Sequence, residues 1–243
     1  MAKTLTPIVV AVIIAVALVI VAGIVSDTAL DIKNRGYVTV KGFAKQELTS
    51  DLGIFRASIV VEDPDLKTCY EKLAADNKKV RDFLKSAHAV SEEDIQFERA
   101  WVREIYQINE KGHATNELDR YALEQAFTLE SGDVSKIAGI ASGVIAILEQ
   151  GVRISIQKPE YLYTKLDDLK IEMVGRATDN ARQRAEMVAE KGNFKLGSIA
   201  NVRTGVFQIT PVNSTTVSDY GINDTSSIEK EIKSVVEIRY FVE

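Results

Sequence analysis

One uninterrupted apolar segment near the start of the chain constrains its fold more than any other feature. Residues 8–25 are all Ile, Val, Ala, Leu or Gly, and Lys3 is the only charged residue before Asp27. A helix of about 20 apolar residues, rising roughly 1.5 Å per residue, spans the hydrocarbon core of a bilayer. We therefore predict a transmembrane helix over residues 7–25. Its apolar surface includes Ile8, Val12, Ile14, Leu18, Val21 and Val25.

The charges beside this segment predict which side of the membrane the rest of the chain occupies. Lys3 precedes the segment, and no cation follows it before Lys33. Because cytoplasmic flanks carry the excess of Lys and Arg, we expect residues 1–6 in the cytoplasm, with the domain exported. Residues 26–35 then form a linker, and residues 36–243 form the exported domain. The alternative is a signal peptide that is cleaved near residues 21–23, which would release a soluble exported protein.

Composition indicates a folded, acidic domain after the apolar segment. Without Lys3 the chain has 29 Lys and Arg against 35 Asp and Glu, a net charge of −6. This charge argues against nucleic acid as a partner. Roughly 215 residues are enough for one large domain or two small ones. Cys69 is the only cysteine, so the chain has no internal disulfide framework, and its place beside an apolar helix face predicts a buried, inert thiol.

Hydrophobic periodicity predicts strands and helices that are mixed along residues 36–243. Helical spacing of apolar residues predicts helices that begin near Asp65, at Asp133 and near Tyr163. Alternation predicts strands from residue 37 and over residues 54–61, 95–108, 121–129, 152–157, 199–209 and 235–242. The polar residues 109–117 predict a turn or a long hairpin loop. This order favours an α+β fold in which helices pack on a largely antiparallel sheet.

Small residues predict close contacts at two of these helices. Gly139 and Gly143 are one helical turn apart, which favours close packing of their helix on a sheet. Ala177, Ala181 and Ala185 repeat along the second half of the longest helix, so its backbone is expected to approach a neighbour closely.

A polar segment near the end of the chain is the candidate interaction surface. Residues 211–227 are rich in Ser, Thr, Asn, Asp and Gly, which predicts a mobile loop. Exposed strand edges recruit other chains readily, and a loop beside them can contribute to the contact. The candidate interaction residues are Pro211, Asn213, Tyr220 and Asn223.

The chain carries no recognisable catalytic motif. It has no phosphate-binding loop, dinucleotide fingerprint or nucleophile elbow. His88 and His113 are the only histidines, and neither has another His or Cys at metal-ligand spacing. We therefore expect no catalytic residues, no cofactor and no metal ion. A hydrolase built on acidic pairs such as Asp167 and Asp168 is an alternative that nothing in the sequence selects.

Four segments, taken in order, resemble the SIMPL-domain family of bacterial envelope proteins. They are residues 37–45 with the following Ser50 and Asp51, residues 121–129, residues 177–197 and residues 235–242. The resemblance covers residues 36–242. The chain departs from the family's opening pattern where Ala44 stands in place of a second glycine and Ser50 precedes Asp51. The resemblance implies an α+β fold in the periplasm or on the outer cell surface.

The resemblance also implies a class of function. Members include periplasmic immunogenic proteins and proteins linked to oxidative-stress defence, and some build large homo-oligomeric, channel-like rings; no catalytic residues are established for them. We therefore expect a non-enzymatic protein of the bacterial cytoplasmic membrane, with its domain in the periplasm, that forms homo-oligomers as an envelope scaffold or stress-related factor. The alternative is a periplasmic module or chaperone that binds a small ligand or a peptide.

Overall fold

The computed structural model describes residues 14, 16–26 and 36–243. Residues 16–26 are helical, and Ile14, Leu18, Val21 and Val25 are all more than half exposed there. Ile8 and Val12 lie outside the described residues. Within the described part of the chain, no helix is both long enough and apolar enough to cross a membrane. The transmembrane helix over residues 7–25 therefore stays a prediction.

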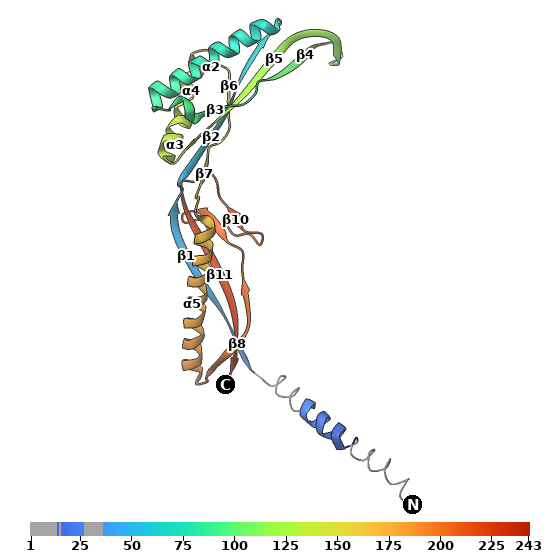
Figure 1. Cartoon of the computed structure of the whole chain (residues 1–243), viewed down its shortest axis with the longest axis vertical. Helices are drawn as coiled ribbons and strands as arrows, with labels where there is room; N and C mark the ends of the chain where they lie inside the picture. Colours follow the sequence, from blue (N-terminus) through green and yellow to red (C-terminus); the bar gives the residue numbers. More distant parts are fainter. Residues whose placement is uncertain (1–13, 15, 27–35) are drawn as a thin grey trace, which may run out of the picture. The chain divides into compact units, whose positions relative to one another are not determined.

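The described chain forms two compact units. The first contains the residues up to Ala44, together with Ile171–Val206 and Ser234–Glu243. The second contains Lys45–Lys170 and Phe207–Lys233. Strand β1 (Tyr37–Thr49), helix α5 (Leu166–Gly192) and strand β11 (Glu229–Val242) each contribute residues to both units. The mixture of helices with largely antiparallel strands confirms the predicted α+β class (Figure 1).

In the first unit, helix α5 packs on strands from β1, β8 and β11 (Figure 1). β8 (Leu196–Thr204) runs antiparallel to the end of β11, with Val236 opposite Thr204. Ala177, Ala181 and Ala185 of α5 are fully buried. A Cβ atom placed on Gly42 of β1 would overlap the backbone oxygen of Ala177 and lie 2.7 Å from the Cβ of Ala181. The predicted close approach of the long helix is therefore confirmed, and Gly42 is its counterpart on the sheet.

The second unit is built on a sheet with the strand order β3-β5-β2-β6, in which β4 also pairs with β5 and β7 with β2. All of these pairings are antiparallel. The same unit contains β9, which pairs antiparallel with Lys230–Lys233 of β11, and β10, which runs parallel to β9. The strand bounds are β2 (Leu52–Asp63), β3 (Ile95–Phe97), β4 (Trp101–Ile108), β5 (Ala114–Ser131), β6 (Ile154–Ile156), β7 (Glu160–Leu162), β9 (Gln208–Pro211) and β10 (Ile222–Asn223).

Helices α2 (Leu66–His88), α3 (Val134–Gly143) and α4 (Ile145–Glu149) pack on this sheet and bury its main core. Strand residues Phe55 and Phe127, whose ring centroids lie 6.1 Å apart, contribute to the same cluster as Leu84 and Ile140 from the helices. A short 3₁₀ helix, η1 (Glu92–Asp94), precedes β3. Asp133 caps α3 as predicted, because its carboxylate accepts hydrogen bonds from the backbone N–H groups of Ser135 and Lys136.

The glycines of α3 make a different contact from the one expected. A Cβ atom on Gly143 would lie 3.0 Å from Nε2 of His88, so these glycines make room for a side chain of α2 rather than for a sheet. The close contact between α3 and the sheet instead depends on Gly53 of β2, where an added Cβ would lie 2.8 Å from Cγ1 of Ile137. His88 is half-buried there, with its ring edge-on to Phe83.

Several predicted boundaries are wrong, for local reasons. The strand expected over residues 95–108 is divided into β3 and β4. Phe97 pairs with Phe127 but Trp101 pairs with Glu124, so one extra residue makes a bulge. The loop expected over residues 109–117 shrinks, because β5 already begins at Ala114. Likewise, the helix after Asp133 is divided into α3 and α4, the strand over 199–209 is divided into β8 and β9, and β7 was not predicted.

Candidate ligand pocket and interaction surfaces

A cavity of about 180 Å³ in the second unit is the first candidate site. Strands β1, β2, β7, β9 and β11 and the start of α5 surround it. Most of its wall is apolar, formed by Leu48, Leu52, Leu162, Leu166 and Ile209. Its polar lining includes Thr164, Asn223 and Lys230. A mainly apolar cavity with a few polar groups is the usual composition of a small-molecule site.

Lys230 is the charged residue of this lining, and it is only 2% exposed. Its Nζ atom donates a hydrogen bond to the backbone oxygen of Tyr161 at 2.5 Å. Burial lowers the pKa of Lys230 below its usual value, and the negative charge of Asp224 opposes this shift. A buried ammonium group is costly unless it is paired, so this position calls for a further partner.

Asp51 and Thr164 fix one side of the cavity. The backbone N–H and the hydroxyl of Thr164 both donate to the Asp51 carboxylate, at 2.7 and 2.8 Å. Ser50 is buried beside it, and its backbone N–H donates to the oxygen of Ile228. Asp51 thus holds the segment after β7 in place against the cavity, and Ser50, which departs from the family's opening pattern, holds the residue before β11.

Glu231, the next residue after Lys230, is also buried but fully paired. Its carboxylate lies 3.0 Å from Nζ of Lys45 and 3.0 Å from Nζ of Lys233. Hydrogen bonds from Lys233 and Lys45 lower the pKa of Glu231 more than its burial raises it. Lys233 also donates to the backbone oxygen of Ser214 at 2.8 Å. This cluster therefore has a structural explanation, since it ties β1 and the loop after β9 to β11.

The four predicted interaction residues occupy different local settings. Pro211 ends β9 and stands opposite Lys230 in the strand register. Asn213 adopts a positive φ of 63°, and Tyr220 is 98% exposed. Asn223 pairs with Ile209 in β10 and lines the cavity. The segment is thus partly strand, and its role as an interaction surface stays a prediction.

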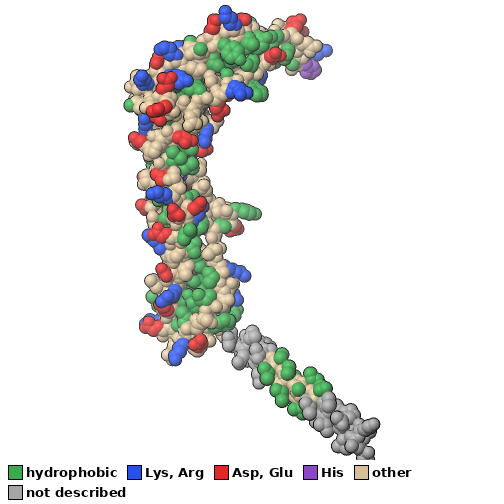
Figure 2. Space-filling view, in the orientation of Figure 1, with side chains coloured by type: hydrophobic (Ala, Val, Ile, Leu, Met, Phe, Trp, Pro, Cys, Tyr) green, Lys and Arg blue, Asp and Glu red, His purple; other side chains and the backbone are tan. Residues whose placement is uncertain are grey.

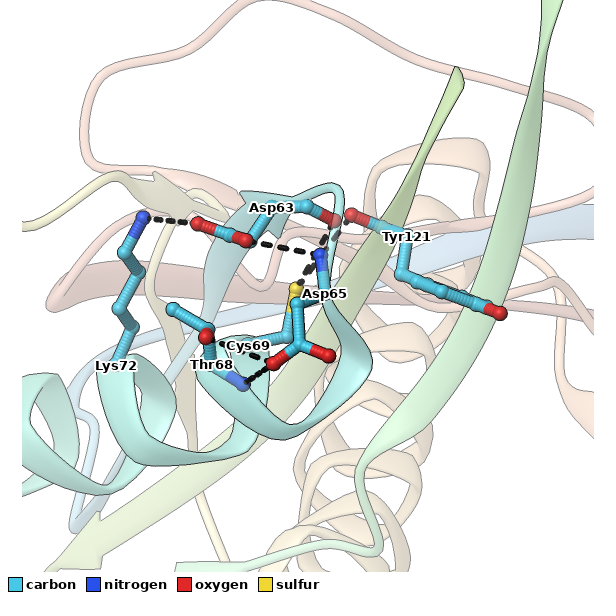
Figure 3. Close-up of polar contacts among 6 residues, drawn as sticks. All are labelled: Asp63, Asp65, Thr68, Cys69, Lys72 and Tyr121. Carbon is cyan, nitrogen blue, oxygen red and sulfur yellow. Dashed lines mark hydrogen bonds and ion pairs between the residues drawn. The ribbon is translucent and has the colours of Figure 1, made fainter. Parts of the chain in front are cut away.

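Cys69 lies at the start of α2, where the chain turns from β2 into the helix (Figure 3). Its Sγ atom is 3.6 Å from the backbone oxygens of both Asp63 and Tyr121. The side chain is fully buried, and burial, followed by the charge of Asp63, raises the pKa of the thiol. The predicted burial of Cys69 is confirmed, and a protonated thiol is a poor nucleophile.

The carboxylates around Cys69 organise the same turn. Asp65 caps α2 by accepting from the backbone N–H and the hydroxyl of Thr68, both at 2.8 Å. Asp63 accepts from the backbone N–H of Asp65 at 2.9 Å and from Nζ of Lys72 at 2.6 Å (Figure 3). These contacts lower the pKa of both carboxyl groups. Both carboxylates therefore have local hydrogen-bond partners, which gives the cluster a structural explanation.

The β4–β5 hairpin is a second candidate surface. Trp101 is 73% exposed and Ile108 is 71% exposed, and Val102, Tyr106 and Leu118 are also exposed. Figure 2 shows hydrophobic side chains gathered over this hairpin. Among the described strands β4 pairs with β5 alone, so its other edge is open. The sequence indicated a strand around Trp101 and Tyr106, but periodicity could not show that neither face of this ribbon is covered.

The remaining polar groups form no recognisable metal site. Across the residues that the structure describes, no three His, Cys, Asp or Glu side chains converge as ligands of a metal ion would. His113 is exposed in the hairpin turn, where its backbone N–H donates to the side chain of Asn109. The expectations of no catalytic residue, cofactor or metal stay predictions.

The sequence of both units matches one known family. The sequence profile of SIMPL, a protein of unknown function (DUF541), matches residues 38–240. The chain belongs to the SIMPL family. This match confirms the resemblance; it covers the whole of the second unit and the part of the first unit that lies between residues 38 and 240. Comparison with curated proteins finds no match. Membership of the SIMPL family therefore establishes the family of the domain, but it does not assign a function.

Proposed function

We propose that this SIMPL-family chain is a non-enzymatic protein of the bacterial cell envelope. In this proposal the helix over residues 7–25 anchors it in the cytoplasmic membrane and residues 36–243 lie in the periplasm. There the domain assembles with other copies of itself as a scaffold or stress-related factor. The apolar sequence of residues 8–25 supports the anchor, and the exposed apolar surface of the β4–β5 hairpin supports the assembly.

The hairpin is the observation that carries the assembly proposal. Trp101 and Ile108 of the hairpin are about three-quarters exposed. Covering them with another protein is favourable by roughly 25 cal/mol for each Å² of apolar surface removed from water. The open edge of β4 offers backbone donors and acceptors to a strand of a second chain. A helix that holds every copy on one membrane raises the local concentration, which favours association through weak contacts.

The mass of the full chain in detergent, measured by light scattering after gel filtration, tests this proposal. We expect a discrete multimer for the wild-type chain and a smaller particle for Ile108→Ser and Trp101→Ser. Ile171→Ser is the matched control, because Ile171 is 74% exposed on α5 and lies outside the hairpin. A monomer at every wild-type concentration would refute self-assembly. A loss of mass in the control equal to that in Ile108→Ser would refute the role of the hairpin.

The loop after β9 is a separate part of the proposed contact. Val217 is 75% exposed and Tyr220 is 98% exposed, so apolar side chains project from a segment that is otherwise polar. The double variant Val217→Ser, Tyr220→Ser should reduce the particle mass if the loop takes part. An unchanged mass would remove the loop from the interface and leave the hairpin proposal intact.

Extraction of membranes with alkaline carbonate tests whether the protein is anchored, and mass spectrometry measures whether the chain is intact. We expect the intact chain in the membrane pellet, with protease reaching residues 36–243 only after the outer membrane is opened. A soluble periplasmic product that begins near residues 21–24 would instead support the cleaved signal peptide. Protease protection inside the cytoplasm would refute export.

A second candidate function is a periplasmic module or chaperone that binds a small ligand or peptide. The cavity lined by Lys230 supports it, because this cavity is mostly apolar and contains an under-paired charge. Thermal-shift screening of the full chain against small metabolites and short peptides tests it in general. A screen without any stabilising compound would count against this function.

A further inference from the structure

The cavity around Lys230 is specific enough to suggest a class of ligand. Lys230 is 2% exposed, and no carboxylate oxygen of the described residues lies within 4.0 Å of its Nζ atom in an ion pair. Its one hydrogen-bond acceptor in the described chain is the neutral backbone oxygen of Tyr161. An ammonium group has three donors, so two of them have no acceptor among the described residues.

Asp224 does not fill this role. Its charge acts on Lys230 from beyond the distance of an ion pair. Its Oδ1 accepts from the backbone N–H and hydroxyl of Ser226, at 2.8 and 2.7 Å, and its Oδ2 is buried without a hydrogen-bond partner among the described residues. Glu231 is equally unavailable, because Lys45 and Lys233 already pair with it. The buried Glu231 carboxylate therefore contacts two cations, whereas the adjacent buried Lys230 ammonium contacts no anion in the described part of the chain.

The rest of the wall determines what kind of anion fits. Leu48, Leu162 and Ile209 surround the cavity with hydrocarbon, which favours an alkyl chain over a second polar group. A phosphate or a dicarboxylate would need several donors, and Lys230 is the only cation of the lining. Asn223, whose side chain has no hydrogen bond within the described chain, adds an amide donor at an exposed part of the wall.

The volume limits the length of the chain. A cavity of 180 Å³ holds the share of liquid volume of about six water molecules, at roughly 30 Å³ each. It therefore accommodates a molecule of about six non-hydrogen atoms, such as butyrate. We propose that this pocket binds a short aliphatic monocarboxylate, with the carboxylate against the Lys230 ammonium and the alkyl chain against the leucine and isoleucine wall. This inference rests on the second candidate function and assigns its ligand class.

Calorimetric titration of the full chain in detergent tests the inference with a matched pair of probes. Butyrate and 1-butanol have similar alkyl chains and differ in charge. We expect butyrate to bind about ten- to a hundredfold more tightly, which is the usual worth of a hydrogen bond to a charged group. Lys230→Met keeps the length of the side chain without the charge, and it should reduce butyrate affinity to that of 1-butanol.

Two further variants separate the explanations. Lys158→Met removes the same charge from an exposed position outside the cavity lining, and it should bind butyrate as the wild type does. Leu162→Phe fills the cavity and keeps Lys230, so it should weaken the binding of both butyrate and 1-butanol. This variant still tests the inference if Lys230→Met fails to fold. Circular dichroism spectra establish which variants are folded.

The outcomes distinguish this inference from the function on which it rests. Equal affinity for butyrate and 1-butanol, with both lost in Leu162→Phe, would overturn the carboxylate assignment but support a ligand-binding cavity. Unchanged butyrate binding in Lys230→Met would overturn the assignment as well. No binding of either probe would also overturn it, whereas the broader ligand function would then depend on the thermal-shift screen alone.

Discussion

Replacement of Gly42 by alanine should loosen the contact between β1 and α5 in the first unit. A Cβ atom at this position would overlap the backbone oxygen of Ala177 and lie 2.5 Å from the backbone nitrogen of Ala181. No side-chain rotation can relieve these contacts, because both atoms belong to the helix backbone. The helix must therefore shift, and α5 loses part of its packing on the strands.

The sign of the effect follows from two opposing magnitudes. Alanine in place of a strand glycine reduces the entropy of the unfolded chain and contributes up to about 1 kcal/mol. Overpacking of a close contact costs about 1–3 kcal/mol, and the upper end applies where backbone atoms collide. We expect Gly42→Ala to destabilise the α5 packing by about 2 kcal/mol, which corresponds to roughly 30-fold at 1.36 kcal/mol for each factor of ten.

Gly175→Ala is the matched substitution with the opposite expected sign. Gly175 lies inside α5, and an added Cβ would have no atom within 4 Å. Alanine is more favourable than glycine in a helix interior by about 1 kcal/mol. The equilibrium constant for opening of α5 should therefore fall roughly fivefold in this variant.

Hydrogen-exchange mass spectrometry on peptides from α5 measures both effects in the full chain. Exchange of the α5 amides should be about 30-fold faster in Gly42→Ala and about fivefold slower in Gly175→Ala, provided exchange follows the opening equilibrium. Exchange in Gly42→Ala within threefold of the wild type would refute the reasoning, because it would mean that α5 accommodates a methyl group at its closest approach.

Three further effects concern charged and sulfur-containing groups. The thiol of Cys69 should react with an aromatic disulfide reagent only slowly in the folded protein and at once in guanidinium chloride; rapid reaction in the folded state would contradict its burial. Asp65→Ala should lower the unfolding temperature near pH 7. Because the folded-state pKa of Asp65 lies below its ordinary value of 3.8, this difference should shrink as the pH falls below 4, and a constant difference would exclude the charged cap. Glu231→Gln should cost about 1–2 kcal/mol in urea unfolding, less than for a fully buried pair because Lys45 can turn to solvent; no change would show that the cluster contributes nothing to stability.

The sequence was sufficient where one pattern dominates a long segment. The predicted helix start at Asp65 is confirmed by the cap on α2, and the alanine repeat of α5 is confirmed as the surface of closest approach. In both cases the local signal and the tertiary contact favour the same structure, so a single sequence is enough to predict them.

The pocket could not be predicted in the same way. Lys230 and Glu231 are adjacent, so they point to opposite faces of β11, and a period-2 pattern would place at most one of them inside. Both are buried because other side chains cover each face: the cavity wall contacts Lys230, and Lys45 of β1, together with Lys233 of β11 itself, contacts Glu231. Three-residue strands such as β7, which helps to form that wall, are too short to give a periodic signal.

The two proposed activities of this SIMPL protein depend on different residues, which makes them separable. Assembly is assigned to side chains of β4 and β5 such as Trp101 and Ile108, and carboxylate binding to the cavity around Lys230. No residue belongs to both sets. Effects at sites without shared partners add, so Ile108→Ser should leave butyrate affinity unchanged and Lys230→Met should leave the particle mass unchanged. The free energy of butyrate binding can be measured in the double variant Ile108→Ser, Lys230→Met and compared with the sum of the two single changes. A departure from that sum of more than about 0.5 kcal/mol would mean that ligand binding and assembly are thermodynamically coupled. The cavity would then act as a regulator of the assembled state rather than as an independent site.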